Sequence, residues 1–205
     1  MRISVKCTFF IILMLITVAT SCSSIKTVSV WKDEGSNQRL RKVLVIAVAE
    51  QDFMRNHFEN VLSENLASRG SEATPSNKVF PQSEKLDRKA IEAKVRELGI
   101  ESVLVARVVS KEEASRLNPG GVYIVPTDYY SGWYGFYSGS FAFVPVPGSA
   151  YDAEFFTIVT NIYDVTSEKL IWSYLSKVKV EESRQGAINP FIDALMKQLN
   201  ESKLL

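Results

Sequence analysis

Histidine and cysteine, which often serve in catalysis and metal binding, are scarce in this sequence. It contains one histidine, His57, and two cysteines, Cys7 and Cys22. Metal sites built from imidazole and thiolate ligands need more of both, which leaves carboxylates as the only metal ligands. A catalytic histidine needs a nucleophile or an orienting carboxylate, and nothing beside His57 indicates either, so we interpret it as packing on a helix flank. We therefore predict no catalytic residue, no cofactor and no metal.

The carboxylates do not point to a site either. Glu50 and Asp52 follow the first predicted strand, where sites of α/β proteins often lie, but capping of the next helix accounts for Asp52. Asp128, Asp152 and Glu154 flank an aromatic-rich segment without the spacing of a calcium loop, and we interpret them as solvated loop charges. A carboxylate pair that hydrolyses a glycan stays open as an alternative, because the sequence selects no pair.

Neither charge is in excess, with 24 basic and 23 acidic residues. A nucleic-acid-binding face needs clustered basic residues, and the densest cluster, Arg39–Lys42, is expected to precede a strand. The sequence therefore predicts no nucleic-acid partner.

The one long apolar run stands at the amino terminus. Arg2 and Lys6 precede Phe9–Ala19, whose eleven residues would rise about 16 Å as a helix, roughly half of the hydrocarbon core of a bilayer. This length is typical of a secretory signal peptide. The run ends in "ATSC", which resembles a bacterial lipobox, although Ala19 stands where a lipobox usually has leucine.

The lipobox resemblance implies that residues 1–21 are removed and that Cys22 carries acyl chains such as palmitate. Cys22 would then be the only cysteine of the mature chain, which leaves no internal disulfide. Two or more acyl chains make attachment to the bilayer effectively permanent. By resemblance to enterobacterial sorting, Ser23 implies the outer membrane, with the domain facing the periplasm. An ordinary signal peptide, which would leave a soluble protein, is the alternative.

The rest of the chain predicts a single α+β domain at 41–205, after a tether at 22–40 in which Val28–Trp31 docks as an edge strand. Hydrophobic periodicity predicts strands over 42–50, 101–109, 154–164 and 169–180, and helices over 52–70, 87–98 and 189–205. A further short strand is expected near Val79–Phe80.

The order of these elements predicts their pairing. Strand, helix, loop, helix and strand favour a parallel pair, and the last two strands favour an antiparallel hairpin. The prediction is a mixed sheet of four or five strands with about three helices. A Gly/aromatic-rich insertion at 118–150 precedes the C-terminal hairpin and helix.

Four features carry a resemblance to known proteins: the lipobox, "RKVLVIAV", "RELGIESVLVARVV" and the hairpin phrase "YDVTSEKLIWS". Together with the aromatic insertion, they resemble small lipoproteins of Gram-negative bacteria, mostly of unknown function. These share the fold of the amino-terminal domain of TolB and of the lipoproteins that activate penicillin-binding proteins. The resemblance implies a non-catalytic partner in the periplasm or envelope.

The segment 128–143 is the most unusual stretch, because half of its sixteen residues are aromatic. One interpretation makes "GVYIVP" and "SFAFVPVP" two strands, with the residues between them folded over the sheet as part of the core. The segment also fits a surface that binds an envelope partner. A third interpretation places it in the headgroup layer, although the basic residues that usually accompany such contact are missing. The residues of the predicted partner surface are Tyr129, Tyr130, Trp133, Tyr134, Phe136 and Tyr137.

We therefore expect a membrane-anchored, non-catalytic lipoprotein that binds an envelope or periplasmic partner. Two alternatives stay open. One is an envelope hydrolase that acts on glycan or lipid, and the other is a structural subunit of an envelope assembly.

Overall fold

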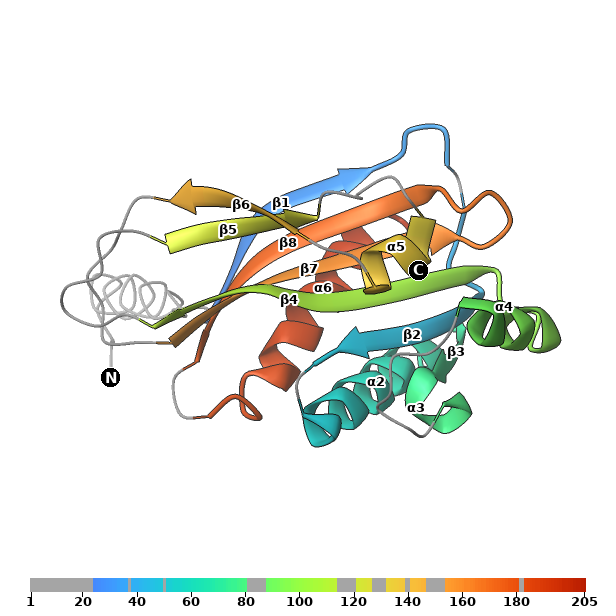
Figure 1. Cartoon of the computed structure of the whole chain (residues 1–205). Helices are drawn as coiled ribbons and strands as arrows, with labels where there is room; N and C mark the ends of the chain where they lie inside the picture. The colour runs from blue at the N-terminus through green and yellow to red at the C-terminus, as the bar shows by residue number, and fades with distance from the viewer. Residues whose placement is uncertain are drawn as a thin grey trace, which may run out of the picture.

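The computed structural model describes residues 24–36, 38–49, 51–80, 88–113, 121–126, 132–138, 141–146, 154–180 and 183–205. This part of the chain contains a mixed six-stranded sheet in the order β1-β8-β7-β4-β2-β3, and a two-stranded sheet, β5-β6. Figure 1 shows the long helices on one side of the large sheet and the small sheet with a short helix on the other.

The strands of the large sheet are β1 (Ile25–Lys32), β2 (Lys42–Val48), β3 (Glu72–Pro75), β4 (Ser102–Glu113), β7 (Glu154–Asp164) and β8 (Leu170–Val180). The small sheet consists of β5 (Gly121–Pro126) and β6 (Phe141–Val146). The helices are α2 (Asp52–Ala67), α3 (Ser76–Val79), α4 (Arg88–Glu97), α5 (Gly132–Ser138) and α6 (Ile188–Glu201).

The parallel half of the sheet is centred on β2, whose residues are buried on both faces. β2 pairs in parallel with β3 on one side and with β4 on the other. Gly70 and Gly99 follow α2 and α4 with φ of 93° and 61°, the left-handed conformation that ends a helix with little strain in glycine.

The antiparallel half is the predicted hairpin of β7 and β8, extended by β1. The hairpin turn is closed by Asp164, whose carboxylate accepts hydrogen bonds of 2.7 Å from the Ser167 backbone and hydroxyl. β1 pairs with β8 at the edge of the sheet and exposes Val28, Val30 and Trp31 by 43, 39 and 47 %. Residues 25–32 of the predicted tether therefore belong to the sheet.

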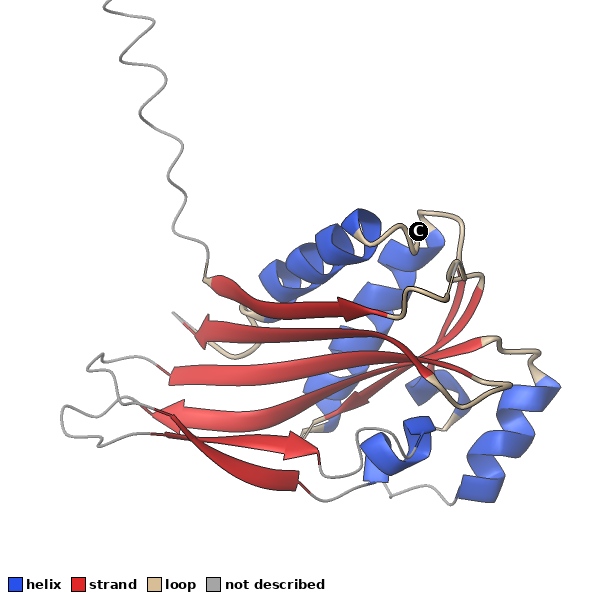
Figure 2. Ribbon diagram, turned by 90° about the horizontal axis from the view of Figure 1, so that it is seen from above, coloured by secondary structure: helices blue, strands red, loops and turns tan. Residues whose placement is uncertain are grey.

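Two hydrophobic cores lie on the two faces of the sheet, and Figure 2 shows helices on both of these faces. On one face, α2 and α6 cover Trp172 and Tyr174, and Phe191 of α6 stacks on Tyr174 with ring centroids 6.5 Å apart. On the other face, Ile91 of α4 and Trp133 of α5 join the second core. Because α2 and α4 lie on opposite faces, the chain crosses the sheet once on each side.

The α+β class and the single mixed sheet are confirmed, but the sheet has six strands and the described residues contain five helices. The prediction of a short strand near Val79–Phe80 is wrong, because Val79 is the last residue of α3. The strand instead lies at Glu72–Pro75, where it pairs with the free side of β2. Asp52 does not cap α2: Gln51 is the N-cap residue, and Asp52 lies in the first turn, where its charge suits the helix dipole.

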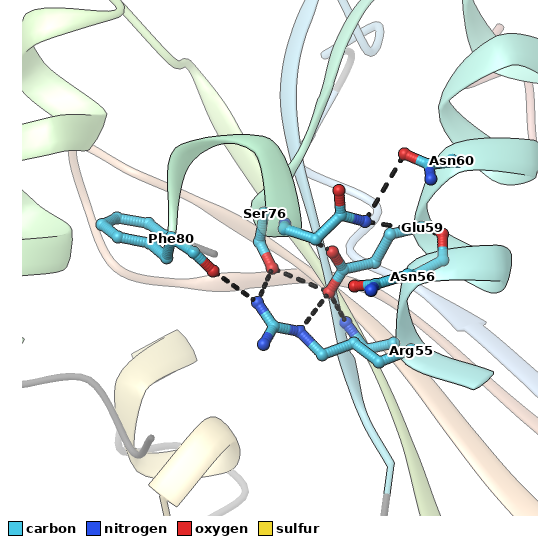
Figure 3. Close-up of polar contacts among 8 residues, drawn as sticks. Arg55, Asn56, Glu59, Asn60, Ser76 and Phe80 are labelled. Atoms are coloured by element: carbon cyan, nitrogen blue, oxygen red, sulfur yellow. Dashed lines mark hydrogen bonds and ion pairs between the residues drawn. The ribbon is translucent and has the colours of Figure 1, made fainter. Parts of the chain in front are cut away.

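The buried carboxylate of Glu59 joins three of these elements (Figure 3). Oε1 accepts hydrogen bonds from the Ala47 backbone at 2.9 Å and the Ser76 hydroxyl at 2.7 Å. Oε2 accepts one from the Asn77 backbone at 2.7 Å. Arg55, one turn earlier in α2, donates to Oε1 at 3.2 Å. Fully hydrogen-bonded in this way, the carboxylate ties α2 to the end of β2 and the start of α3.

The position of this carboxylate follows from the end of β3. Pro75 pairs with Val45 and is the last residue of β3. On that side of β2, Ala47 is therefore beyond the reach of a strand partner, and Glu59 accepts its hydrogen bond instead. Arg55 also donates to the Phe80 carbonyl at 3.1 Å, which holds the residue after α3 against the same helix.

We predict that Glu59→Gln lowers the free energy of unfolding by about 3 kcal/mol, because an amide cannot accept every donor and leaves Arg55 without its counter-charge. Urea unfolding followed by circular dichroism measures this loss. Glu64→Gln, on the exposed face of the same helix, is the matched control and should change stability by less than about 0.5 kcal/mol. Equal stability of the two variants would contradict the role given to Glu59.

Candidate functional site

A pocket of about 410 Å³ opens at the carboxyl end of β2, on the sheet face covered by α2 and α6. Its described lining residues are Ala47, Val48, Ala49, Gln51, Met54, Phe58, Ala106, Arg107, Val108, Lys111, Phe156, Ile158, Val178, Val180, Arg184, Ala187, Ile188 and Phe191. The volume lies within the usual range for small-molecule sites, about 300–1,000 Å³.

The topology of the sheet explains why the pocket lies there. From β2 the chain crosses one face through α2 to β3, and from β3 it crosses the opposite face through α4 to β4. α2 leaves the carboxyl end of β2 on the face that the pocket occupies, and β4 runs parallel to β2 beside it, so the crevice opens at this end of the two strands, between α2 and α6. Small side chains at Ala47, Ala106 and Ala187 keep this crevice open.

The walls of the pocket are almost entirely apolar. Met54 and Phe58 come from α2, and Ile188 and Phe191 from α6. The sheet adds apolar residues of β7 and β8, among them Phe156. Gln51 is the one neutral polar side chain among the lining residues that the structure describes. Such a lining favours an apolar ligand, since it offers few hydrogen-bonding groups.

Charged side chains stand at one side of the pocket. Arg184 donates to both carboxylate oxygens of Glu154, with Nη2–Oε1 at 2.7 Å and Nε–Oε2 at 3.2 Å. Lys111 Nζ lies 3.2 Å from the same Oε1. The Arg184 guanidinium also lies 5.4 Å from the ring centroid of Phe156, where it caps the apolar wall. We call Lys111, Glu154 and Arg184 the rim cluster.

The rim cluster sets the ionisation of its acid. The hydrogen bond from Arg184 holds the pKa of Glu154 below its ordinary value, and Lys111 acts in the same direction against the opposing effect of burial. Four residues before Lys111 in β4, burial lowers the pKa of Arg107. Arg107 Nη1 donates to the Tyr137 carbonyl at 3.1 Å, which joins β4 to α5.

The predicted partner surface lies only partly within the described residues. Tyr129 and Tyr130 fall outside them, and of Phe136 only the backbone is described, within α5. Trp133 is 2 % exposed in the second core, and Tyr134 and Tyr137 pack against that core half-buried. This is the packing that the core interpretation expected, with α5 as an unforeseen helix between the two predicted strands. Partner binding by these six residues stays a prediction.

The other predicted site residues lie apart from the pocket or outside the described residues. Cys22, the predicted lipid attachment, lies outside them, as do Glu50, Asp128 and Asp152. His57 stacks on Phe53 along α2, with ring centroids 6.1 Å apart. Among the described residues, no three His, Cys, Asp or Glu side chains gather as metal ligands, and no helix is long and apolar enough to cross a membrane.

Sequence reasoning missed the pocket and two members of its rim. Glu154 was interpreted as a solvated loop charge, whereas it belongs to β7 and binds two cations. Arg184 lies thirty residues further along the chain. The available signal was the predicted strand over 154–164 itself, which already placed Glu154 at its first position.

Comparison with known proteins gives no family. No protein-family model and no curated protein matches the sequence. A variant of PelC from Paraburkholderia phytofirmans, a dodecamer, is 14 % identical, with 84 % of this chain and 97 % of that chain covered and a TM-score of 0.46. The lipoprotein GNA1162 from Neisseria meningitidis is also 14 % identical, with 78 and 99 % covered and a TM-score of 0.41.

At these identities and TM-scores we base no functional argument on either structure. One of the two similar proteins is a lipoprotein, the class that the sequence resembles. The resemblance to the TolB domain and to the activators of penicillin-binding proteins stays a prediction.

We predict that the rim cluster stabilises the fold at neutral pH and not in acid. The folded-state pKa of Glu154 is depressed, so its contribution is fully present above the ordinary glutamate value of about 4.3 and is lost as the pH falls through the folded value. Glu154→Gln should thus be less stable than wild type at pH 7, by about 1 kcal/mol or less for a pair this close to solvent.

Urea unfolding at neutral pH and in acid measures the effect. The difference between wild type and Glu154→Gln should vanish in acid. The control is Glu34→Gln, at an exposed position after β1, which should match wild type at both pH values. A difference for Glu154→Gln that is independent of pH would contradict the electrostatic explanation.

Proposed function

We propose that this chain is a lipid-anchored, non-catalytic binding protein of the bacterial envelope, whose pocket takes an apolar group of its ligand or partner. The observation that carries the proposal is the pocket itself: a largely apolar space at the carboxyl end of β2, with charged side chains on one side. This combination is typical of binding sites in which apolar walls supply affinity and a few polar groups fix orientation.

Support for a non-catalytic role comes from the chemistry of the rim. Glu154 is the one acidic residue that the described part of the chain places there, and its lowered pKa makes it a poor proton acceptor or donor at neutral pH. Lys111 and Arg184 are both engaged with it. These groups are suited to holding a charge and not to transferring a proton.

Support for anchoring comes from the sequence. The apolar run Phe9–Ala19 and the lipobox-like "ATSC" favour acylation of Cys22, and Ser23 favours the outer membrane, with the domain in the periplasm. The first strand, β1, begins at Ile25, three residues after Cys22. A tether this short would keep the domain close to the bilayer surface.

The experiment is the purification of the wild-type protein from detergent-solubilised envelopes, with mass spectrometry of the intact chain and of the molecules that accompany it. We expect a mature chain that begins at an acylated Cys22 and a bound species that is lost in Ala187→Trp, where the new side chain fills the pocket. Ala67→Trp, at an exposed position on α2, should retain that species. An unmodified chain refutes the anchoring, and a species shared by all three forms refutes the pocket.

The exposed edge of the sheet favours a second candidate function, as a structural subunit of an envelope assembly. Val28, Val30 and Trp31 are half of the large hydrophobic residues that stand exposed in the described part of the chain, and all lie on β1. An exposed apolar edge strand is a template for pairing with another chain. We propose a second copy of this chain, paired through β1, as the partner in that role.

Sedimentation of a Cys22→Ser form tests the assembly. We expect a dimer or larger species that Trp31→Lys converts to a monomer, because a charge on an edge strand opposes pairing. Phe53→Lys is the control, since Phe53 is a 57 % exposed aromatic residue away from β1. A monomer at every protein concentration rules out assembly through β1.

A further inference from the structure

We propose that the ligand of the pocket is a long-chain fatty acid from the surrounding membrane, with its acyl chain between α2 and α6 and its carboxylate beside Lys111 and Arg184. This inference rests on the proposed function, because it names the ligand of the same pocket. It is carried by three observations: the lining, the rim cluster, and the place where the chain leaves the domain.

The lining selects against ligands with many polar groups. A peptide or a sugar would bring hydrogen-bonding groups into a wall formed by residues such as Phe58, Ile158 and Phe191, where unsatisfied polar groups weaken binding. A straight hydrocarbon chain brings none, and it gains from every methylene that it removes from water. The lining therefore fits an acyl chain better than a peptide segment or a glycan.

The rim cluster supplies a match for the head of such a ligand. Among the described residues that line the pocket, the charged ones are Arg107, Lys111 and Arg184, and none is acidic. Lys111 and Arg184 already meet on the carboxylate of Glu154, so their geometry suits a carboxylate.

The path of the chain brings this end of the sheet close to the predicted anchor. Ile25, the first residue of β1, pairs with Val178, which lines the pocket, and the Ser24 carbonyl accepts a hydrogen bond of 2.8 Å from the Lys179 backbone. Cys22 precedes Ile25 by three residues, a span of roughly 10 Å at most. An anchor at Cys22 would therefore hold the pocket near the membrane, the natural source of fatty acids.

The test measures binding of palmitate, octanoate and hexadecanol by calorimetry. It uses a Cys22→Ser chain without residues 1–21, which keeps every residue that the structure describes. We expect palmitate to bind, octanoate to bind more weakly because it buries fewer methylenes, and hexadecanol to bind roughly tenfold more weakly because it lacks the charge-assisted hydrogen bonds. Equal binding of palmitate and hexadecanol overturns the role of the rim cluster.

Three variants locate the ligand. Ala187→Trp should abolish palmitate binding, whereas Ala67→Trp should preserve it. Arg184→Gln combined with Lys111→Gln should remove the roughly tenfold preference for palmitate over hexadecanol, because the charge-assisted hydrogen bonds to the carboxylate are lost. Lys197→Gln, at an exposed position on α6, controls for loss of a surface charge. Circular dichroism and urea midpoints verify that each variant folds. Undiminished palmitate binding by Ala187→Trp overturns the inference.

The remaining outcomes separate this inference from the proposed function. One outcome is that palmitate does not bind while the species that copurifies with the wild type from envelopes is still absent from Ala187→Trp. In that case the ligand is of another class, and only the fatty acid is refuted. If neither effect is seen, both proposals fail. If the lipidated wild type, reconstituted in vesicles, does not bind the palmitate that the Cys22→Ser chain binds, the protein's own acyl chain fills the pocket, and a membrane fatty acid is refuted as the occupant.

Discussion

The carboxylate of Glu59 is the interaction on which the parallel half of the molecule depends. It is fully buried, and it accepts hydrogen bonds from the end of β2, from the start of α3 and from a neighbouring arginine. An ion in such a place is tolerated only when nearly all of its hydrogen-bonding capacity is used. Because one of its donors is the Ala47 backbone, the same carboxylate fixes the end of β2, which forms the floor of the pocket.

The pocket is the space left by well-packed elements that diverge. Large side chains fill both faces of the sheet near its middle, where Trp172 and Tyr163 are fully buried. Towards the carboxyl end of β2 the residues are small, with alanines at positions 47, 49 and 106. The first turns of α2 and α6 border this region, and the rim cluster closes one side of it. The crevice is thus a product of topology and of local side-chain size together.

Much of the fold could be predicted, because burial leaves a recognisable pattern of apolar residues in the sequence. The run at 42–48 is apolar throughout since β2 is covered on both faces, and the spacing of Phe58, Leu62 and Leu66 follows from the one buried face of α2. β3 left no such trace. It is four residues long, it lies at an edge, and it contains Glu72 and Pro75, so its pairing with β2 depends on tertiary contacts.

The candidate site was predicted less well than the fold. A pocket consists of places that side chains do not fill, and no periodicity records an empty volume. The rim cluster joins β4, β7 and the turn before α6, so its proximity arises only in the folded chain. For the aromatic segment, too, the sequence could not decide between burial and exposure. Its composition fits a core as well as a surface, and it was the position of α5 over β4 and β7 that buried Trp133.

The way in which β1 joins the sheet bears on how the domain would withstand mechanical load. Any pull from the amino terminus enters at Ser24 and acts first on the hydrogen bonds between β1 and the end of β8. The carboxyl end of β1 is held by a hydrogen bond, which Lys32 Nζ donates to the Ser202 carbonyl at 2.8 Å. A pull on the amino terminus would therefore strain this outermost ladder before the inner strands of the sheet, and β1 would be the first strand to detach.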